Sequence, residues 1–248
     1  MTKNQKRDLR QEITDKILAA LKAGVAPWVK PWTGRAGDGL PINIKTGKAY
    51  RCVIFWKFIK RLDKDGEERD AFPLLKAYTV FNRAQTEGLP EPEVVEVPAH
   101  ERHAHAEATI QATGAKISYG GNQAFYDRSG DRVQVPNLDT FHNPESFYSV
   151  AFHELAHWTG AKSRLNREKG KAFGDELYAK EELVAELAAA YLCAEHRISG
   201  ELQHESYIAN WIRALEGDSN FIFSASSKAQ KASDYIVNRP QEEAKKAA

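Results

Sequence analysis

The stretch Phe152-His153-Glu154-Leu155-Ala156-His157-Trp158 decides the fold of this chain, because it carries the pattern His-Glu-x-x-His. On a helix, residues four positions apart lie on one face, so His153 and His157 can direct their imidazoles at one point. Two neutral imidazoles at this spacing suit a divalent cation, above all zinc. The alternative is a helix with two surface histidines that bind nothing. The apolar residues before the pattern and the Thr159-Gly160 stop after it favour the metal helix.

Glu154 follows the first predicted ligand and faces the place where a bound water would lie. A carboxylate there can take a proton from the water, while a metal lowers the pKa of that water towards about 7. We therefore predict that Glu154 is the catalytic general base of a metal-dependent hydrolase.

A tetrahedral site of this kind needs a third protein ligand. The next long helical pattern, over residues 175–197, carries acids beside an apolar stripe. We predict Glu182 as the third ligand and Glu186 as the acceptor for a histidine N–H, which fixes the tautomer of that ring. Two alternatives stay open: Glu186 is itself the ligand, or these acids are solvated surface charges, as most glutamates are.

The residues of both helices carry a resemblance. The pair His153 and His157, followed by a glutamate from the next helix, resembles the zincin metallopeptidases. The longer His-Glu-Leu-Ala-His-Trp-Thr-Gly is similar to the metallopeptidase domain of ArdC-type antirestriction proteins, over roughly residues 115–240. This resemblance implies peptide hydrolysis with Zn²⁺, Mn²⁺ or another divalent metal, a host protein as substrate, and protection of incoming plasmid DNA from restriction after conjugation.

Composition and charge place the chain among ordinary globular proteins. Of its 248 residues, 42% are hydrophobic and 28% charged, and no apolar run reaches the length of a membrane span. The two cysteines, Cys52 and Cys193, give no disulfide framework. These features predict a reduced, cytoplasmic protein without a membrane partner.

Positive charge is concentrated at the N-terminus. Residues 1–60 hold 13 Lys and Arg against 4 Asp and Glu, whereas the remainder holds 22 against 30. This asymmetry predicts a basic module that binds a polyanion, most simply nucleic acid.

Aromatic rings alternate with cations after a predicted helix over residues 9–21. Bases stack on such rings at about 1–3 kcal/mol each, and the cations meet the phosphates of a single strand. The predicted DNA-binding residues are Trp28, Lys30, Trp32, Arg35, Lys45, Lys48, Tyr50 and Arg51. The alternative, in which Trp28 and Trp32 are core residues, stays open, and one packed ring can coexist with one exposed ring.

The same segment resembles the N-terminal single-stranded-DNA-binding domain of the ArdC-type family and a segment fused to some plasmid primases. It departs from the family after Tyr50-Arg51, where a Gly-rich loop and a further helix usually follow. Either that segment is absent from this chain, or residues are missing between Tyr50 and Arg51. In the second case, the Cα atoms of Tyr50 and Arg51 lie well over about 3.8 Å apart.

The predicted fold class is α+β: a small mixed N-terminal module over residues 1–95, followed by a zincin-like metallopeptidase domain over residues 96–248. The first module ends with strands at 52–59 and 74–81 around a charged loop.

The second module begins with a helix at 98–113, whose three histidines face water or form a second metal site. Strands at 116–119, 124–126 and 132–135 precede the metal helix, with 124–126 at the edge by resemblance. A last helix is predicted over 222–236, with a loose tail from 241.

Overall fold

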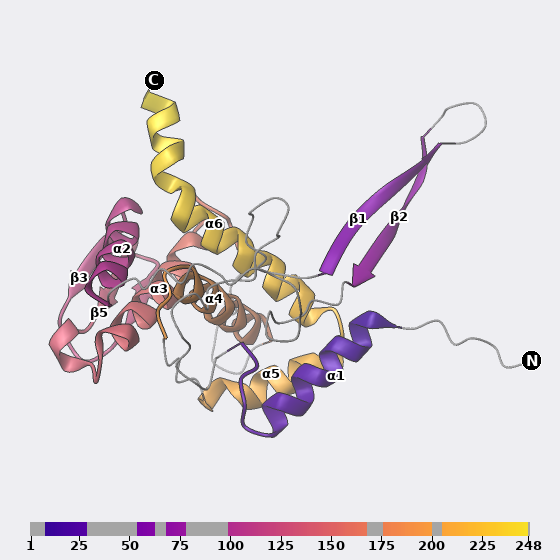
Figure 1. The fold of residues 1–248 in the computed structure, drawn as a ribbon, viewed down its shortest axis with the longest axis horizontal. Helices are drawn as coiled ribbons and strands as arrows, with labels where there is room; N and C mark the ends of the chain where they lie inside the picture. Colours follow the sequence, from indigo (N-terminus) through magenta and orange to yellow (C-terminus); the bar gives the residue numbers. More distant parts are fainter. Residues whose placement is uncertain are drawn as a thin grey trace, which may run out of the picture. The chain divides into compact units, whose positions relative to one another are not determined.

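A computed structural model describes residues 8–28, 54–62, 68–77, 99–167, 176–199 and 205–247, and Figure 1 draws their helices and strands as a ribbon. The predicted α+β class is confirmed. In chain order the elements are α1 (Leu9–Lys22), β1 (Ile54–Leu62), β2 (Glu68–Ala77), α2 (Ala99–Ala112), β3 (Lys116–Tyr119), β4 (Phe125–Asp127), β5 (Arg132–Val135), a 3₁₀ turn (Leu138–Thr140), α3 (Pro144–Thr159), α4 (Glu176–Glu195), α5 (Glu205–Gly217) and α6 (Phe221–Ala247).

Strands β1 and β2 form an antiparallel hairpin, paired from Ile54 with Ala77 to Leu62 with Glu68. They belong to a compact unit of their own, Pro41–Val94. The predicted strand bounds are wrong here, because both strands run into the charged stretch that was expected to be a loop. Strand pairing depends on backbone hydrogen bonds, and alternating charged residues do not prevent it in a two-stranded hairpin.

The second sheet has the order β3-β5-β4, with β3 parallel to β5 and β4 antiparallel to it. Strand β4 therefore lies at an edge of this three-stranded sheet, as predicted. Gly120 and Gly121 turn the chain after β3 with φ angles of 122° and 71°. Residues that carry a Cβ atom rarely adopt such positive φ angles.

Helix α3, the predicted metal helix, begins where its sequence predicts. The Asn143 side chain accepts a hydrogen bond from the Ser146 amide, and Pro144 occupies the first turn, where its missing N–H costs nothing. Gly160 caps the other end. From Phe147 on, every residue of α3 except Val150 is buried, so the helix is covered on all sides.

Two apolar clusters bury α3 and α4. One joins α1, α4, α5 and α6, including Leu183, Trp211 and Phe221. The other joins α2, the three-stranded sheet and α3, including Val133 and Phe152. Residues of α3 and α4 contribute to both clusters, so the metal helix and its neighbour form the centre of this unit.

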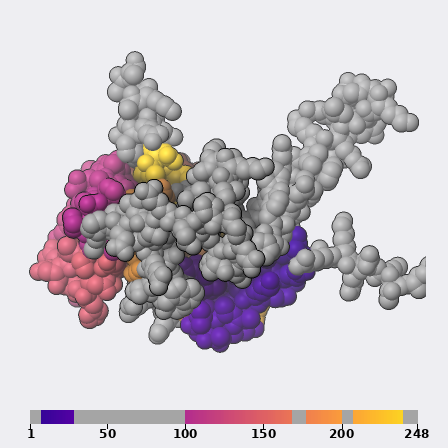
Figure 2. All heavy atoms as spheres, viewed as in Figure 1, coloured from indigo at the N-terminus to yellow at the C-terminus, as the bar shows by residue number. Residues whose placement is uncertain are grey.

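Helix α1 belongs to the first of these clusters, through Leu18 and Leu21. The Thr14 hydroxyl donates a hydrogen bond to the Ser219 carbonyl, 3.0 Å away. Figure 2 shows the other face of α1, in indigo, at the surface. The compact unit thus consists of Met1–Leu40 with Val95–Ala248. The predicted boundary near residue 95 lies outside the described residues and stays a prediction.

Helix α6 extends further than predicted, to Ala247. The expectation of a loose tail from residue 241 is wrong, because the residues there (Gln, Glu, Ala and Lys) are all strong helix formers. None of the described helices combines the length and the apolar character that a membrane crossing requires.

A polar network fastens the β4–β5 turn to the end of α3. The Arg164 guanidinium donates to both carboxylate oxygens of Asp131, to the Tyr126 hydroxyl and to the Trp158 carbonyl, and it lies 4.0 Å from the centre of the Trp158 ring. Asp131 has a left-handed backbone, with φ 46°. Its hydrogen bond from Arg164 lowers the pKa of its carboxyl to about 2.

Asp131→Asn tests this network, because asparagine also accepts a left-handed backbone. The folded-state pKa of Asp131 lies below the ordinary value of 3.8, so the ion pair stabilises the fold above about pH 4 and is lost as pH falls towards 2. The substitution should lower the free energy of unfolding at pH 7 by at most about 1 kcal/mol, since this carboxylate is half-exposed. Urea unfolding between pH 3 and pH 7 should show the difference shrinking at the acid end; a constant difference would contradict the assignment.

Leu21→Ala tests whether α1 is part of the C-terminal core. Leu21 is 1% exposed, so its truncation should lower the free energy of unfolding by about 2–5 kcal/mol. Val25→Ala is the matched control, because Val25 is 47% exposed. Equal effects of the two substitutions in thermal or urea unfolding would show that α1 does not contribute to the core.

Candidate metal centre

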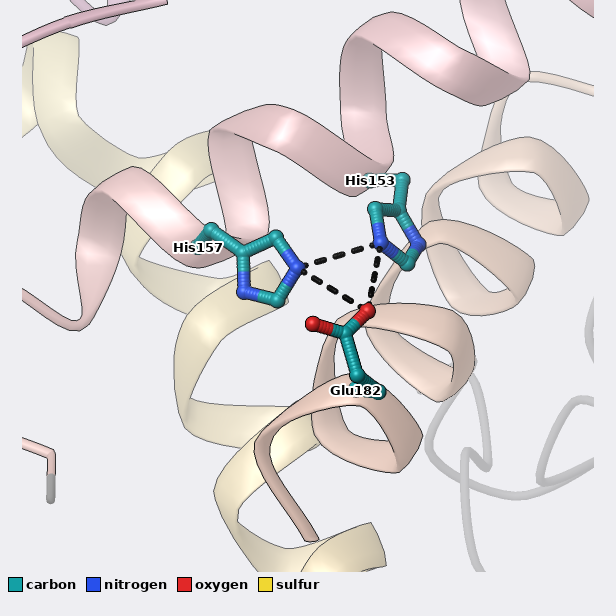
Figure 3. Close-up of side chains that lie close together, drawn as sticks. All are labelled: His153, His157 and Glu182. Carbon is teal, nitrogen blue, oxygen red and sulfur yellow. Dashed lines mark hydrogen bonds and ion pairs between the residues drawn. The ribbon is translucent and has the colours of Figure 1, made fainter. Parts of the chain in front are cut away.

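The packing of α3 against α4 brings His153, His157 and Glu182 together (Figure 3). The two Nε2 atoms are 3.1 Å apart, and each lies 3.4 Å from Oε2 of Glu182. The rings meet edge to face, with an interplanar angle of 79°. Among the described residues this is the one group of three or more His, Cys, Asp and Glu that could hold a metal ion.

The centre is buried. His153 and His157 are each 5% exposed, and Glu182 is 4% exposed. The alternative in which these side chains are solvated surface groups therefore does not apply. Glu154 follows His153 on the same helix and is 8% exposed, so the predicted general base also lies inside the protein.

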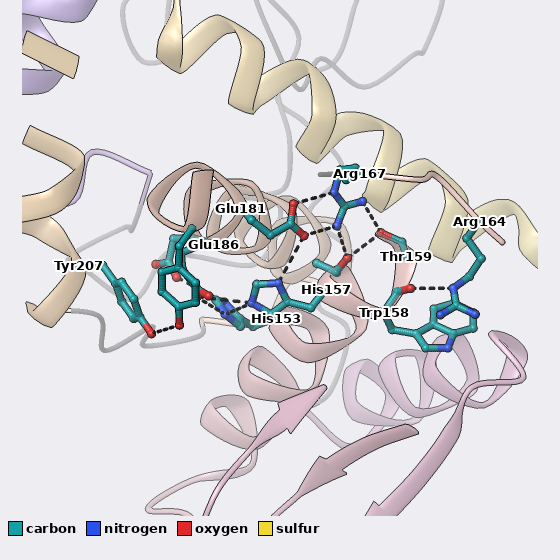
Figure 4. A network of polar contacts seen from close by, with 12 residues as sticks. His153, His157, Trp158, Thr159, Arg164, Arg167, Glu181, Glu186 and Tyr207 are labelled. Atoms are coloured by element: carbon teal, nitrogen blue, oxygen red, sulfur yellow. Dashed lines mark hydrogen bonds and ion pairs between the residues drawn. The ribbon is translucent and has the colours of Figure 1, made fainter. Parts of the chain in front are cut away.

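His157 is held from the side opposite Glu182 by a network that the sequence did not predict (Figure 4). Its Nδ1 lies 3.4 Å from Oε1 of Glu181. The Arg167 guanidinium donates two hydrogen bonds to Glu181, of 3.0 and 2.8 Å. Burial raises the pKa of Glu181, but the bonds with His157 and Arg167 outweigh it and bring the pKa to about 2.

His153 is flanked by Glu186, whose Oε2 lies 3.7 Å from Nδ1 of the ring. Glu186 is 1% exposed. Its other oxygen accepts a hydrogen bond of 3.5 Å from the indole N–H of Trp28. Glu186 therefore lies beside His153, and Glu182 rather than Glu186 places a carboxylate oxygen 3.4 Å from both Nε2 atoms.

The carboxylates change the acidity of both imidazoles. Burial by itself lowers the pKa of His153, but contacts with Glu182 and Glu186 more than reverse this, so the pKa is raised. In His157, burial lowers the pKa and is likewise outweighed by Glu181 and Glu182. The same contacts lower the pKa of Glu182 despite its burial. The centre is therefore rich in negative charge and favours a cation among its nitrogen and oxygen atoms.

Two tyrosines lie near the centre. The hydroxyls of Tyr178 and Tyr207 are 3.0 Å apart, and the Tyr207 ring stacks on Trp211. Burial, the bond to Tyr207 and the charge of Glu182 all raise the pKa of Tyr178, and burial raises the pKa of Tyr207, so both hydroxyls stay protonated at neutral pH.

The three histidines of α2 form no second metal site in the described part of the chain. His100 and His105 are exposed. His103 bonds to Glu145 at 3.2 Å and lies against the Tyr148 ring.

Of the predicted DNA-binding residues, the structure describes Trp28. It is half-buried and meets the Trp211 ring edge-on at 5.6 Å, which is the packed arrangement left open above. The other seven, and the Tyr50–Arg51 junction, lie outside the described residues: Lys30, Trp32, Arg35, Lys45, Lys48, Tyr50 and Arg51.

Sequence reasoning missed Glu181 and Arg167. Glu181 directly precedes the predicted ligand, and an acid at this position could have been considered as a partner of the second histidine. Arg167 had no signal of its own, because its position depends on how the connection after α3 folds back.

Comparisons with known proteins agree with this geometry. The family model described as zincin-like metallopeptidase matches residues 104–228, and the model described as the N-terminal domain of anti-restriction factor ArdC matches residues 7–53. The chain is 33% identical to the uncharacterized protein y4eC of Sinorhizobium fredii (strain NBRC 101917 / NGR234), over 92% of this chain and 91% of that protein. It is also 33% identical to a DNA primase TraC of Escherichia coli, over 94% of this chain but 27% of the primase.

Two solved structures of the antirestriction ArdC protein from the R388 plasmid are similar over nearly the whole chain. The metal-free one has a TM-score of 0.78 and 31% identity, and covers 95% of this chain and 99% of that one. The Mn(II)-bound one has a TM-score of 0.73 and 31% identity, and covers 94% and 98%. The chain therefore belongs to the ArdC antirestriction family, with an N-terminal ArdC domain and a zincin-like metallopeptidase domain.

Proposed function

We propose that this protein binds single-stranded DNA through its basic N-terminal segment and hydrolyses peptide bonds at a divalent-metal centre held by His153, His157 and Glu182. The observation that carries the proposal is the convergence of these three side chains within 4.8 Å, beside the buried Glu154. The peptide substrate is a host protein, and the biological result is protection of incoming plasmid DNA from restriction in the cytoplasm.

The donor atoms fit such a metal. Two imidazole nitrogens and one carboxylate oxygen are a ligand set that zinc and other first-row divalent ions accept. The neighbouring carboxylates raise the pKa of both His153 and His157 despite their burial, so the centre favours positive charge among its donor atoms. We propose Zn²⁺ as the native ion; the Mn(II)-bound structure of the R388 protein supports a divalent ion and makes Mn²⁺ the main alternative.

Glu154 is the proton carrier in the proposed reaction. When bound, the cation supplies Lewis-acid polarisation of the substrate carbonyl and lowers the pKa of the attacking water. Glu154 takes the proton from that water and later returns it to the leaving amine. Glu181 lies beside His157 and Glu186 beside His153, where each carboxylate can orient its ring.

The N-terminal segment supports the DNA-binding part of the proposal. It combines the cations and rings described above with the match to the N-terminal ArdC domain over residues 7–53. Of its two tryptophans, Trp28 is packed, so we assign base stacking to Trp32 and Tyr50. The shared segment in an enzyme named as a DNA primase agrees with a role on DNA.

Glu154→Gln tests the hydrolytic part. The substitution keeps the size of the side chain but removes the base, so hydrolysis of labelled casein should fall by about 10²–10⁴-fold. Metal uptake, thermal stability and DNA affinity should stay near the wild-type values. Glu145→Gln is the matched control, because it removes a carboxylate from the same helix outside the centre.

Hydrolysis by Glu154→Gln at the wild-type rate would contradict the assignment of the base. Antirestriction in cells that is equal in wild type and Glu154→Gln, with no hydrolysis by either, would instead support a protein in which the metal only stabilises the fold.

A salt titration tests the DNA-binding part. The affinity for a fluorescent oligo(dT) should fall steeply with salt, with a slope of about −0.7 per phosphate contact in a plot of log K against log salt. Lys30→Ala and Lys45→Ala should each make this slope less steep by about that amount, whereas the exposed Lys231→Ala should not. Absence of binding at low salt would refute this part and leave an intracellular peptidase whose basic segment docks a protein.

A further inference from the structure

Among the residues whose side chains the structure describes, Arg167 is the one buried arginine or lysine, whereas four glutamates are buried around the two histidines. It is 9% exposed and comes from the connection after α3, outside both helices of the centre. We propose that Arg167 is a positioning residue of the metal centre, acting on His157 through Glu181. This role rests on the proposed function, because it concerns the binding of the metal.

The backbone fixes Arg167 over the end of α3. The connection folds back so that the Arg167 amide donates to the Gly160 carbonyl at 3.0 Å, and the Asn166 amide donates to the Ala161 carbonyl at 2.9 Å. Asn166 permits this turn with a φ of 47°, which asparagine tolerates. A Cβ on Gly160 would lie 3.0 Å from Nη2 of Arg167, so the glycine leaves room for the guanidinium.

Every nitrogen of the guanidinium is used. Nε and Nη2 hold the two oxygens of Glu181, Nη1 donates to the Thr159 hydroxyl at 2.7 Å, and Nη2 also donates to the Ala156 carbonyl at 2.6 Å. Two of these partners, Ala156 and Thr159, lie on either side of His157 in the sequence. Arg167 therefore fixes Glu181 relative to the very turn of α3 that carries the ligand.

The consequence for His157 is a defined tautomer. With Glu181 fixed, its Oε1 accepts from Nδ1 of the ring, so the proton of the neutral imidazole stays on Nδ1. The lone pair of Nε2 then faces His153 and Glu182, where the cation is held. Without the guanidinium, Glu181 would be a buried, uncompensated carboxylate next to Glu182, free to turn away from His157 or to compete for the cation.

The experiment is a titration of the metal-stripped full-length protein with Co²⁺ alone. Binding is measured through the visible absorption band of the bound Co²⁺, whose shape reports the geometry of its ligands. Arg167→Lys keeps the charge but loses the paired bonds, Glu181→Gln removes the charge of the partner, and Arg167→Met combined with Glu181→Gln removes both charges. Each single variant should weaken Co²⁺ binding by about 10–100-fold and change the shape of the band. When Glu181→Gln is already present, adding Arg167→Met should have little further effect, because Arg167 acts through Glu181.

Arg164→Met is the matched control. Arg164 comes from the same connection and also bonds to a backbone carbonyl of α3, but its carboxylate partner is Asp131, away from the centre. It should lower thermal stability and leave the affinity for Co²⁺ and the absorption band unchanged. Circular dichroism confirms that each variant compared is folded.

The outcomes separate the two proposals. If the wild-type protein takes up no Co²⁺, the proposed metal centre fails. If it binds Co²⁺ and the folded Arg167→Lys and Glu181→Gln variants bind within about twofold of it, the positioning role is overturned while the centre stands. Equal weakening by Arg164→Met would also overturn it, because a general loss of stability would then explain the result.

Discussion

The structure depends on placing four carboxylates and two imidazoles between two buried helices. Glu154, Glu181, Glu182 and Glu186 are each at most 8% exposed, and water cannot screen them as it would at the surface. Nearby groups compensate the negative charge of three of them. The imidazoles of His153 and His157 contact Glu181, Glu182 and Glu186. The Arg167 guanidinium pairs with Glu181, and the Trp28 indole donates a hydrogen bond to Glu186. The apolar clusters on both sides of α3 and α4 hold these groups in contact, so the stability of the core and the geometry of the centre have the same origin.

The convergence of His153, His157 and Glu182 could be predicted because the relations that define it are local. His153 and His157 are one helical turn apart, and Glu182 lies on the next long amphipathic pattern, so helical periodicity and a known ligand chemistry suffice. The start of α3 at Asn143 and Pro144 follows from the same kind of local rule. To choose between Glu182 and Glu186, one must know which face of α4 points towards the two histidines. Only the packing of α4 against α3 determines that.

The remaining features depend on contacts between distant segments. Arg167 reaches Glu181 because a left-handed residue, Asn166, reverses the connection, and no periodicity marks that reversal. The packing of α1 could not be predicted either, since an amphipathic helix does not specify its partner. Composition also misjudged the hairpin and the end of α6, where polar residues continue a strand or a helix. The alignment with y4eC spans 281 positions, more than the chain contains, so that relative has residues without counterparts here.

The contact between Trp28 and Glu186 joins the two matched regions of the chain. Leu18, Leu21 and Trp28 lie within the N-terminal ArdC segment, yet they pack into the apolar cluster around Trp211. Trp28 also donates a hydrogen bond to Glu186, the carboxylate beside His153. A protein expressed from residue 99 onwards would present that cluster to solvent and invite aggregation. Evolution faces the same restriction, because recombination that separated the segments would leave both with uncovered apolar surface. In the E. coli primase both segments occur together, in an alignment that includes 94% of this chain.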